Sequence, residues 1–460
     1  MKSSFLFFSL YFLVFWSMSA MARPSDGQHI KETPSSSLEL HNFTLENGLK
    51  VTLIPHGNIP KATISLVIDS GRNSDGERPG ISELTLSTII DNKNTQSGRS
   101  IAALGGKISS TLSDETSTIE FDVLSEFTSK AIFLLADKIL KPEFSEASLL
   151  SYKIDKVREF NAGRVFPANI ADDAFFKSII GSQKYHTKFP TTNDLDEISL
   201  DEVKSHASKI FSPNRSHIYV AGIFDKKLVA EALNKAFGEW LRKETIIQAV
   251  KIKQLPPTLT LIEREGAPQS TIRLGLSTIE KNHPDYLALT IANTLLGGYF
   301  SSRITRNIRE QKGYAYYPLS ELNDFYTSSI WYQSADVSIE HTGASIQEIL
   351  HEIRTLSDSP PLQSELDGVK NYMAGVYILK RANRKELINL VSELDRFEIE
   401  RNYLNEYADS LLAVSPQDVS RVVRSHLVPG RMHLTIVGDS ELVAPQVKKI
   451  DLFDNFLENR

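Results

Sequence analysis

Residues 213–222 read Pro213-Asn214-Arg215-Ser216-His217-Ile218-Tyr219-Val220-Ala221-Gly222, and residues 429–438 read Pro429-Gly430-Arg431-Met432-His433-Leu434-Thr435-Ile436-Val437-Gly438. Each stretch places a proline-led turn before a short apolar run that ends in glycine, which is typical of a buried strand. A second pair, 52–66 and 260–274, repeats a strand, a proline and another strand at a constant offset. The chain is therefore predicted to be an internal duplication of one folding unit.

The order of elements inside the first copy indicates the fold class. Alternating and helical apolar spacings predict strands at 50–54, 62–68, 106–113, 116–124 and 216–221, and helices from about 81, at 127–140, at 149–160 and just before Pro213. Strands mixed with helices on one face form a two-layer α+β domain. We therefore predict two homologous two-layer α/β domains in tandem.

The predicted domain limits follow from the duplication and from the start of the chain. Lys2, the apolar run 5–16 and Ala20-Met21-Ala22 have the order of a secretory signal, and the run is too short to span a membrane. The predicted parts are a signal peptide (1–22), a flexible lead-in (23–37), an N-terminal domain (38–245), a linker (246–255), a C-terminal domain (256–445) and a tail (446–460).

Composition excludes several functional classes. The 460 residues are 41% hydrophobic and 23% charged, which is ordinary globular composition. There is no cysteine, so disulfides, thiolate metal ligands and lipid attachment at a cysteine are excluded. The net charge of −6 and the lack of basic runs give no sign of nucleic-acid binding. After signal cleavage we expect no membrane span and an exported protein, periplasmic or secreted.

No familiar catalytic pattern replaces a metal motif in this chain. Its 11 histidines include no pair with the spacing His-x-x-Glu-His, His-x-x-x-His or His-x-His. No Gly-x-Ser-x-Gly elbow and no phosphate-binding loop occurs either. His217 and His433 are equivalent positions of the repeat beside strand residues, and a structural role is the simplest interpretation.

Five motifs carry a resemblance that covers nearly all of residues 39–445. They are Asn47-Gly48-Leu49-Lys50-Val51, Ala103-Leu104-Gly105-Gly106-Lys107, Leu295-Leu296-Gly297-Gly298-Tyr299-Phe300-Ser301-Ser302-Arg303, Ile308-Arg309-Glu310-Gln311-Lys312-Gly313-Tyr314-Ala315-Tyr316 and Ala413-Val414-Ser415-Pro416-Gln417-Asp418-Val419. With them the chain resembles the pitrilysin and mitochondrial-processing-peptidase family of zinc peptidases. The resemblance implies two homologous domains per chain and two such units that close like a clamshell around a peptide.

The resemblance also locates a lost metal site. Active members carry His-x-x-Glu-His, in which two histidines bind zinc and the glutamate activates the metal-bound water. The matching positions here are Glu83, Leu86 and Ser87, and the distal ligand matches Glu159. Leucine cannot accept a proton and serine is a poor zinc ligand. We therefore expect no catalytic residue and no zinc in this chain, with Glu159 as a possible remnant ligand.

The C-terminal half keeps residues that the resemblance assigns to substrate. Arg309 and Tyr316 match an Arg/Tyr pair that binds the substrate backbone near the metal, and Gly297 and Gly298 match a glycine-bearing loop that handles substrate in non-catalytic subunits. The residues alone also allow plainer interpretations. Arg309 can compensate a helix dipole, Tyr316 can be a core residue, and the glycine pair can end a helix.

Three functions stay open at this point. The first is a catalytically inactive subunit of an exported heterodimeric zinc peptidase, whose homologous active partner carries the zinc while this chain closes the peptide chamber and supplies Arg309 and Tyr316. The second is a homodimeric peptide-binding or structural protein without proteolysis. The third is an autonomous hydrolase with an unrecognised site.

Overall fold

The computed structural model describes residues 38–90, 101–181, 187–243 and 255–452. Residues from Glu39 onward belong to one compact unit. The predicted signal peptide, the lead-in and nearly all of the predicted linker lie outside the described residues. None of the helices among the described residues has both the length and the apolar character needed to cross a membrane.

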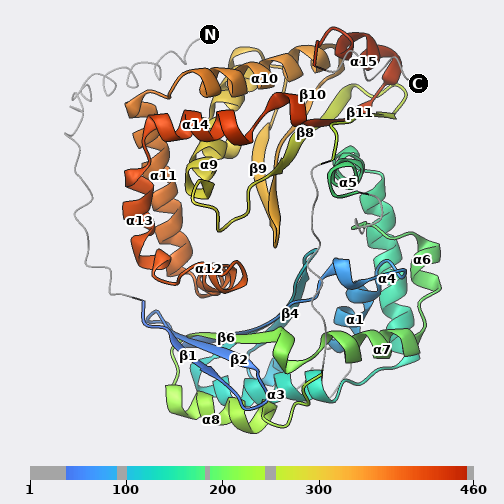
Figure 1. Cartoon of the computed structure of the whole chain (residues 1–460). Helices are drawn as coiled ribbons and strands as arrows, with labels where there is room; N and C mark the ends of the chain where they lie inside the picture. Colours follow the sequence, from blue (N-terminus) through green and yellow to red (C-terminus); the bar gives the residue numbers. More distant parts are fainter. Residues whose placement is uncertain (1–37, 91–100, 182–186, 244–254, 453–460) are drawn as a thin grey trace, which may run out of the picture. The chain divides into compact units, whose positions relative to one another are not determined.

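Two sheets form the framework of the fold (Figure 1). The first has the strand order β1-β2-β6-β3-β5-β4, and the second has the order β7-β11-β8-β10-β9. The strands are β1 (His41–Thr44), β2 (Lys50–Pro55), β3 (Lys61–Ile68), β4 (Lys107–Leu112), β5 (Ser117–Leu124), β6 (Ser216–Gly222), β7 (Leu259–Glu263), β8 (Gln269–Thr278), β9 (Leu319–Phe325), β10 (Ser328–Ser338) and β11 (His433–Gly438).

The two sheets have the same topology once the extra edge strand β1 is set aside. In each sheet the first long strand pairs in parallel with the last one, β2 with β6 and β7 with β11. All other neighbours are antiparallel. The repeated stretches 213–222 and 429–438 contain β6 and β11, which occupy equivalent places in the two sheets. The prediction of two homologous α/β domains in tandem is therefore confirmed.

The helices connect and cover these strands. They are α1 (Ile81–Ile89), α3 (Thr128–Leu140), α4 (Glu146–Arg164), α5 (Pro167–Ile180), α6 (Thr192–Asp196), α7 (Leu200–Ile210), α8 (Lys226–Phe237), α9 (Tyr286–Asn293), α10 (Thr342–Asp358), α11 (Gln363–Ala382), α12 (Arg384–Arg396), α13 (Tyr403–Ala413), α14 (Pro416–His426) and α15 (Ser440–Val447). Two π-helical segments, η4 (Thr294–Gly298) and η5 (Thr305–Gln311), follow α9.

Each sheet has one strongly apolar face that forms the core of its half. In the first sheet every second residue of the central strands is fully buried, including Ile64, Leu66 and Phe121, and packs against α1, α3, α7 and α8. In the second sheet the corresponding face, which includes Trp331, packs against α9, α10, α14 and α15. This alternation of side chains is why the strand periodicity in the sequence predicts the fold.

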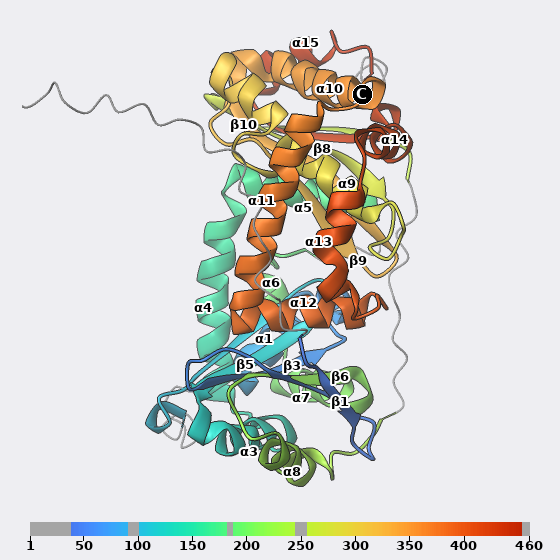
Figure 2. The same cartoon turned by 90° about the vertical axis from the view of Figure 1, so that its left-hand side faces the viewer.

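The opposite face of each sheet carries one helix from the other half of the chain. Helix α12 packs on β3 and β6 of the first sheet, and α5 packs on β8 and β11 of the second (Figures 1 and 2). The α5 contact is aromatic, with Phe175 and Phe176 against Tyr332. The α12 contact is polar, with Lys385 paired to Glu120 at 3.1 Å. The sequence did not predict this exchange of helices.

Candidate functional site

Helix α1, which carries the matched zinc-motif positions, begins at a tightly built corner. Gly80 has a left-handed φ of 90°, and a Cβ at this position would lie 2.6 Å from Leu195. The Asp75 carboxylate accepts hydrogen bonds from the backbone N–H groups of Gly80 at 2.8 Å and Ser82 at 3.1 Å. The carboxylate therefore caps the helix and stabilises its N-terminal dipole.

The position matched to the catalytic base belongs to the hydrophobic core. Leu86 is 2% exposed and packs in the same cluster as Ile89 and the central strands. Ser87 is also buried. An apolar side chain in this environment can neither hold a water molecule nor move a proton. The predicted loss of the base therefore comes with a packing role for the residue that replaces it.

The two carboxylates matched to metal ligands are joined by a lysine. Helix α4 packs against α1 and places Lys156 Nζ 2.7 Å from Glu83 Oε1 and 2.9 Å from Glu159 Oε2. Burial alone lowers the pKa of the ammonium group, but attraction and hydrogen bonding to the two carboxylates outweigh burial and raise it. Lys156 is therefore a permanent cation between two positions that match zinc ligands.

These residues do not fit a zinc ion. The matched positions offer carboxylates but no imidazole, and zinc in such sites needs three protein ligands. Both carboxylates are already bound to an ammonium group. Within the described ranges, no group of three or more His, Cys, Asp or Glu side chains could hold a metal ion. We therefore derive no step through a metal in this chain.

Arg309, the matched substrate residue, lies in a very different environment. It is in η5, which ends before Gly313 at φ +67°. Its guanidinium lies 4.4 Å from the Phe300 ring centre and 5.4 Å from that of Tyr316. Phe300 is 60% exposed and Tyr316 is 79% exposed, so the plainer interpretation of Tyr316 as a core residue is wrong.

Arg309 differs from two cationic neighbours, Arg303 and Lys312, in the partners of its charge. Arg303 forms an ion pair with Glu365 at 2.6 Å, and Lys312 forms one with Glu348 at 2.5 Å. Arg309 has no carboxylate partner among the described residues. Stacking on aromatic faces holds a guanidinium while leaving the N–H groups at its edge available. The geometry can therefore offer a fixed fork of donors to a carbonyl or carboxylate.

The glycine pair before this site has a clear packing role in one position. A Cβ at Gly297 would lie 2.2 Å from Ser320 Oγ and 2.9 Å from Ser320 Cβ, so only glycine fits there. At Gly298 the nearest atom, Asn293 Nδ2, is 3.2 Å away. Gly297 thus lets η4 approach β9 closely. The assignment of either glycine to substrate stays a prediction.

The equivalent histidines of the repeat each contact an exchanged helix. His217 lies 2.9 Å from the hydroxyl of Tyr219 and 3.7 Å from Asp395 of α12. His433 lies 3.2 Å from Ser178 of α5. Burial lowers the pKa of each imidazole to about 4, so both are neutral at neutral pH. Both are held by structural partners, in agreement with the simplest interpretation of the sequence.

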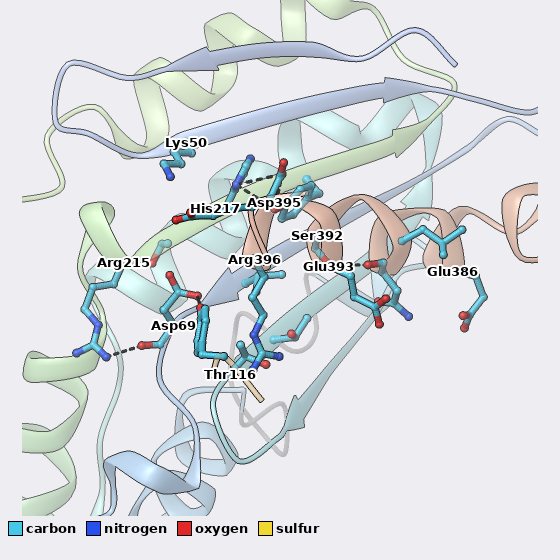
Figure 3. A pocket seen from close by; sticks show the side chains of 18 of the residues that line it. Lys50, Asp69, Thr116, Arg215, His217, Glu386, Ser392, Glu393, Asp395 and Arg396 are labelled. Atoms are coloured by element: carbon cyan, nitrogen blue, oxygen red, sulfur yellow. Dashed lines mark hydrogen bonds and ion pairs between the residues drawn. The ribbon is translucent and has the colours of Figure 1, made fainter. Parts of the chain in front are cut away.

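A polar pocket of about 480 Å³ lies between α12 and the first sheet (Figure 3). Tyr219 donates to Asp395 at 2.9 Å, and Glu393 is paired with Lys281 at 3.0 Å. Arg396 is paired with Glu115. Three lining carboxylates are thus occupied by internal donors, namely Asp395, Glu393 and Asp69, which accepts from the Tyr326 hydroxyl at 2.9 Å. No motif in the sequence indicates this pocket, because its residues come from both halves of the chain.

The matched site residues therefore form two separate groups. Glu83, Lys156 and Glu159 lie together on α1 and α4, while Arg309, Tyr316 and Phe300 lie together in the C-terminal half. No hydrogen bond, ion pair or ring contact among the described residues joins the two groups. Sequence reasoning assigned no role to Lys156, three residues before Glu159, or to Phe300, which lies inside a quoted motif.

The duplicated fold and the missing ligands define a class, namely a peptidase-like chain without the zinc chemistry of its fold. Comparison with family models agrees with this class. Residues 50–179 match the model "Insulinase (Peptidase family M16)", and residues 197–373 match "Peptidase M16 inactive domain". The two models together match more than half of the chain. The chain belongs to the M16 peptidase family, as an inactive member, which confirms the resemblance.

Individual relatives cover most of the chain at low identity. An uncharacterized zinc protease YmxG of Bacillus subtilis (strain 168) is 24% identical over 394 residues, 84% of this chain and 95% of that protein. The non-peptidase homolog YmxG of Helicobacter pylori is 19% identical over 410 residues, 86% of this chain and 93% of that protein. A peptidase M16 inactive domain from Pseudomonas fluorescens superposes with a TM-score of 0.81 at 20% identity, over 87% of this chain and 98% of that one.

Proposed function

We propose that this chain is the silent subunit of an exported heterodimeric zinc peptidase and presents Arg309 and Tyr316 to a peptide bound at the zinc of its partner. The main support for this proposal is the difference between the partners of two cationic side chains, Lys156 and Arg309. Lys156 is bound to Glu83 and Glu159, whereas Arg309 has no carboxylate partner among the described residues and lies between exposed aromatic rings.

The chemistry of this arginine suits a peptide backbone. A guanidinium presents N–H donors in a rigid plane, and a fork of this kind holds a carbonyl oxygen in a defined direction. Tyr316 adds a hydroxyl donor on a rigid ring that is mostly exposed. Residues that hold substrate without reacting accelerate a reaction by orienting the scissile bond. This is what a subunit without its own metal can contribute.

The partner supplies what this chain lacks. We expect a homologous chain with an intact His-x-x-Glu-His motif, because the zinc ligands and the base must come from outside this chain. Zinc is therefore expected in the partner. The predicted signal sequence at 1–22 supports export of this chain, and the proposal requires a partner exported to the same compartment.

The experiment combines this chain with a homologue that carries the intact motif. We expect the two to form a stable complex, and the complex to cleave peptides faster than the partner alone. Arg309→Ala should lower kcat/KM of the complex by about 10- to 100-fold, because a charge-assisted hydrogen bond contributes about 1.5–3 kcal/mol. The matched control is Arg306→Ala on the same helical segment, since Arg306 is exposed and, within the part of the chain that the structure describes, its side chain bonds to the Ser301 carbonyl alone, at 3.2 Å.

Other outcomes would lead to a different function. Full activity of the partner alone, with no association, contradicts the proposal. Stable self-association with peptide binding but no cleavage would favour the homodimeric binding protein. Peptidase activity of the isolated chain that survives chelation would favour an autonomous hydrolase.

A further inference from the structure

We infer that Lys156 is a built-in replacement for the metal ion: its ammonium group joins α1 to α4 through Glu83 and Glu159 and keeps divalent cations out of the vacated position. This inference goes beyond the proposed function and does not depend on a partner chain. It rests on the two contacts at 2.7 and 2.9 Å and on the burial of the lysine.

The position of the ammonium group is that of a bridging cation. Glu83 comes from α1 and Glu159 from α4, so the two carboxylates belong to different helices that pack together. Without a cation between them, two like charges on facing helices would repel. The side chain of Lys156 is 18% exposed and that of Glu83 is 23% exposed, so water screens their contact only partly, whereas Glu159 is 62% exposed and its contact is the weaker of the two.

The lysine is also held in place by its own surroundings. Its Nζ lies 5.9 Å from the ring centre of Phe160, a buried residue one turn further along α4. Because the ammonium is covalently attached to α4, its local concentration at the carboxylates is far higher than that of any free cation. A divalent ion would have to displace it and would then find two carboxylates and no imidazole, which is a weak donor set.

The consequence is that the family's metal position is filled here, which differs from a site that has merely lost its ligands. The site should be insensitive to added metal, and the contact should contribute to stability. Both properties can be measured on the isolated full-length chain, so their failure is distinguishable from a failure to find a peptidase partner.

The test compares thermal unfolding of three variants with that of the unchanged chain. Lys156→Met keeps an unbranched side chain close to the length of the lysine stem and removes the charged group. We expect Tm to fall by about 2–5 °C, because two carboxylates lose their cation. Lys153→Met, on the same helix, is the matched control: Lys153 bonds to the exposed Asp196 carbonyl at 2.9 Å, and its loss should change Tm by less than about 1 °C.

Metal is the second arm of the test. We expect millimolar Zn²⁺ or Ca²⁺ to raise Tm of Lys156→Met and to leave the unchanged chain and the double variant Glu83→Gln/Lys156→Met unaffected. A Tm of Lys156→Met equal to that of Lys153→Met overturns the inference, as does a Lys156→Met variant that ignores both cations. Should Lys156→Met not fold, elemental analysis of the unchanged chain after incubation with excess zinc decides: less than about 0.1 zinc per chain agrees with the inference, and stoichiometric zinc overturns it.

Discussion

The metal position on α1 and α4 differs from the arginine site on η5 in whether the charged side chains are paired inside the protein. At the metal position Lys156, Glu83 and Glu159 satisfy one another, and the base position is buried as Leu86. At the arginine site the guanidinium of Arg309 lies between two exposed rings without a carboxylate partner among the described residues. The two regions lie on different elements, the α-helices α1 and α4 in the first half and the π-helical segment η5 in the second.

This difference bears on which of the two regions can still bind a ligand. A group whose charge is satisfied inside the protein stabilises the fold and has nothing left to offer a ligand. A group whose charge is exposed and unpaired contributes little to stability, and it remains available for binding. The charges of the first region are thus paired inside the protein, while the guanidinium of the second has no carboxylate partner among the described residues, as the proposed binding role requires. Four predictions test whether this contrast holds.

The largest effect is expected at the base position. Leu86→Glu places a carboxylate in the core of the first half, without a partner, and should lower the free energy of unfolding by about 3 kcal/mol or more. Denaturant unfolding followed by circular dichroism measures this loss. The matched control is Leu150→Glu on α4, which is 60% exposed and should cost less than about 0.5 kcal/mol. Equal stability of the two variants would show that Leu86 faces water. The metal position would then not differ from the arginine site in the way described.

A smaller effect is expected in the loop before the arginine site. Gly297→Ala brings a methyl group within 2.2 Å of Ser320 Oγ and should cost about 1–3 kcal/mol through overpacking. Gly298→Ala meets its nearest atom at 3.2 Å and should cost less than about 1 kcal/mol. Thermal unfolding of both variants provides the measurement. If Gly298→Ala instead abolished peptide binding at unchanged stability, this glycine would join Arg309 as a substrate residue.

The third prediction concerns pH at the start of α1. His206 lies 3.0 Å from Ser82 Oγ, and burial, together with the charges of Lys209 and Arg215, lowers its pKa to about 4. An unfolded histidine titrates near 6.5, so between about pH 6.5 and 4 the unfolded state binds more protons. Stability should therefore fall as pH drops through this window, by on the order of 1–3 kcal/mol for this residue.

The variant His206→Gln checks the assignment, because glutamine can still bond to Ser82 and does not titrate. Urea midpoints at pH 7 and pH 4.5 should differ less for His206→Gln than for the unchanged chain. His217 and His433 also have lowered pKa values and stay in both proteins, so some pH dependence remains. If the urea midpoint changes equally between the two pH values in both proteins, His206 is not held neutral by the fold.

Much of the fold was predictable because duplication leaves a pattern in the sequence. Constant offsets between repeated strands predicted two similar domains, and the two sheets indeed share one strand order. The exchange of α5 and α12 was not predictable in the same way. A helix with an apolar stripe needs a surface to cover, but its sequence does not specify which of two similar sheets provides that surface. The choice depends on the path of the chain in space.

The features of the candidate site also divide into those that a local motif indicates and those that depend on the three-dimensional fold. The assignment of Glu83, Leu86 and Ser87 to the zinc-motif positions follows from a local motif and stays a prediction. The role of Lys156 could not be predicted from the sequence, because its contact with Glu83 joins two helices that are far apart in the chain. The one feature of the sequence that indicates a contact of Lys156 is its spacing of three residues from Glu159 on the same predicted helix. The stacking of Phe300 on Arg309 likewise requires η4 and η5 to be placed.

The smallest effect sharpens the arginine side of the contrast. Phe300→Ala removes one of the two rings that hold the Arg309 guanidinium, and an exposed cation–π contact contributes about 0.5–1 kcal/mol. We expect peptide affinity to fall about two- to fivefold, with Tm nearly unchanged because Phe300 is mostly exposed. Tyr317→Ala, at a similarly exposed ring, is the matched control, and fluorescence anisotropy with a labelled peptide provides the measurement. The Arg309 Nε resonance in an NMR spectrum should also shift in Phe300→Ala and stay in place in Tyr317→Ala, since only the former removes a ring from its face. A resonance that does not move would show that the guanidinium is not held there, and Arg309 would then be an ordinary surface arginine.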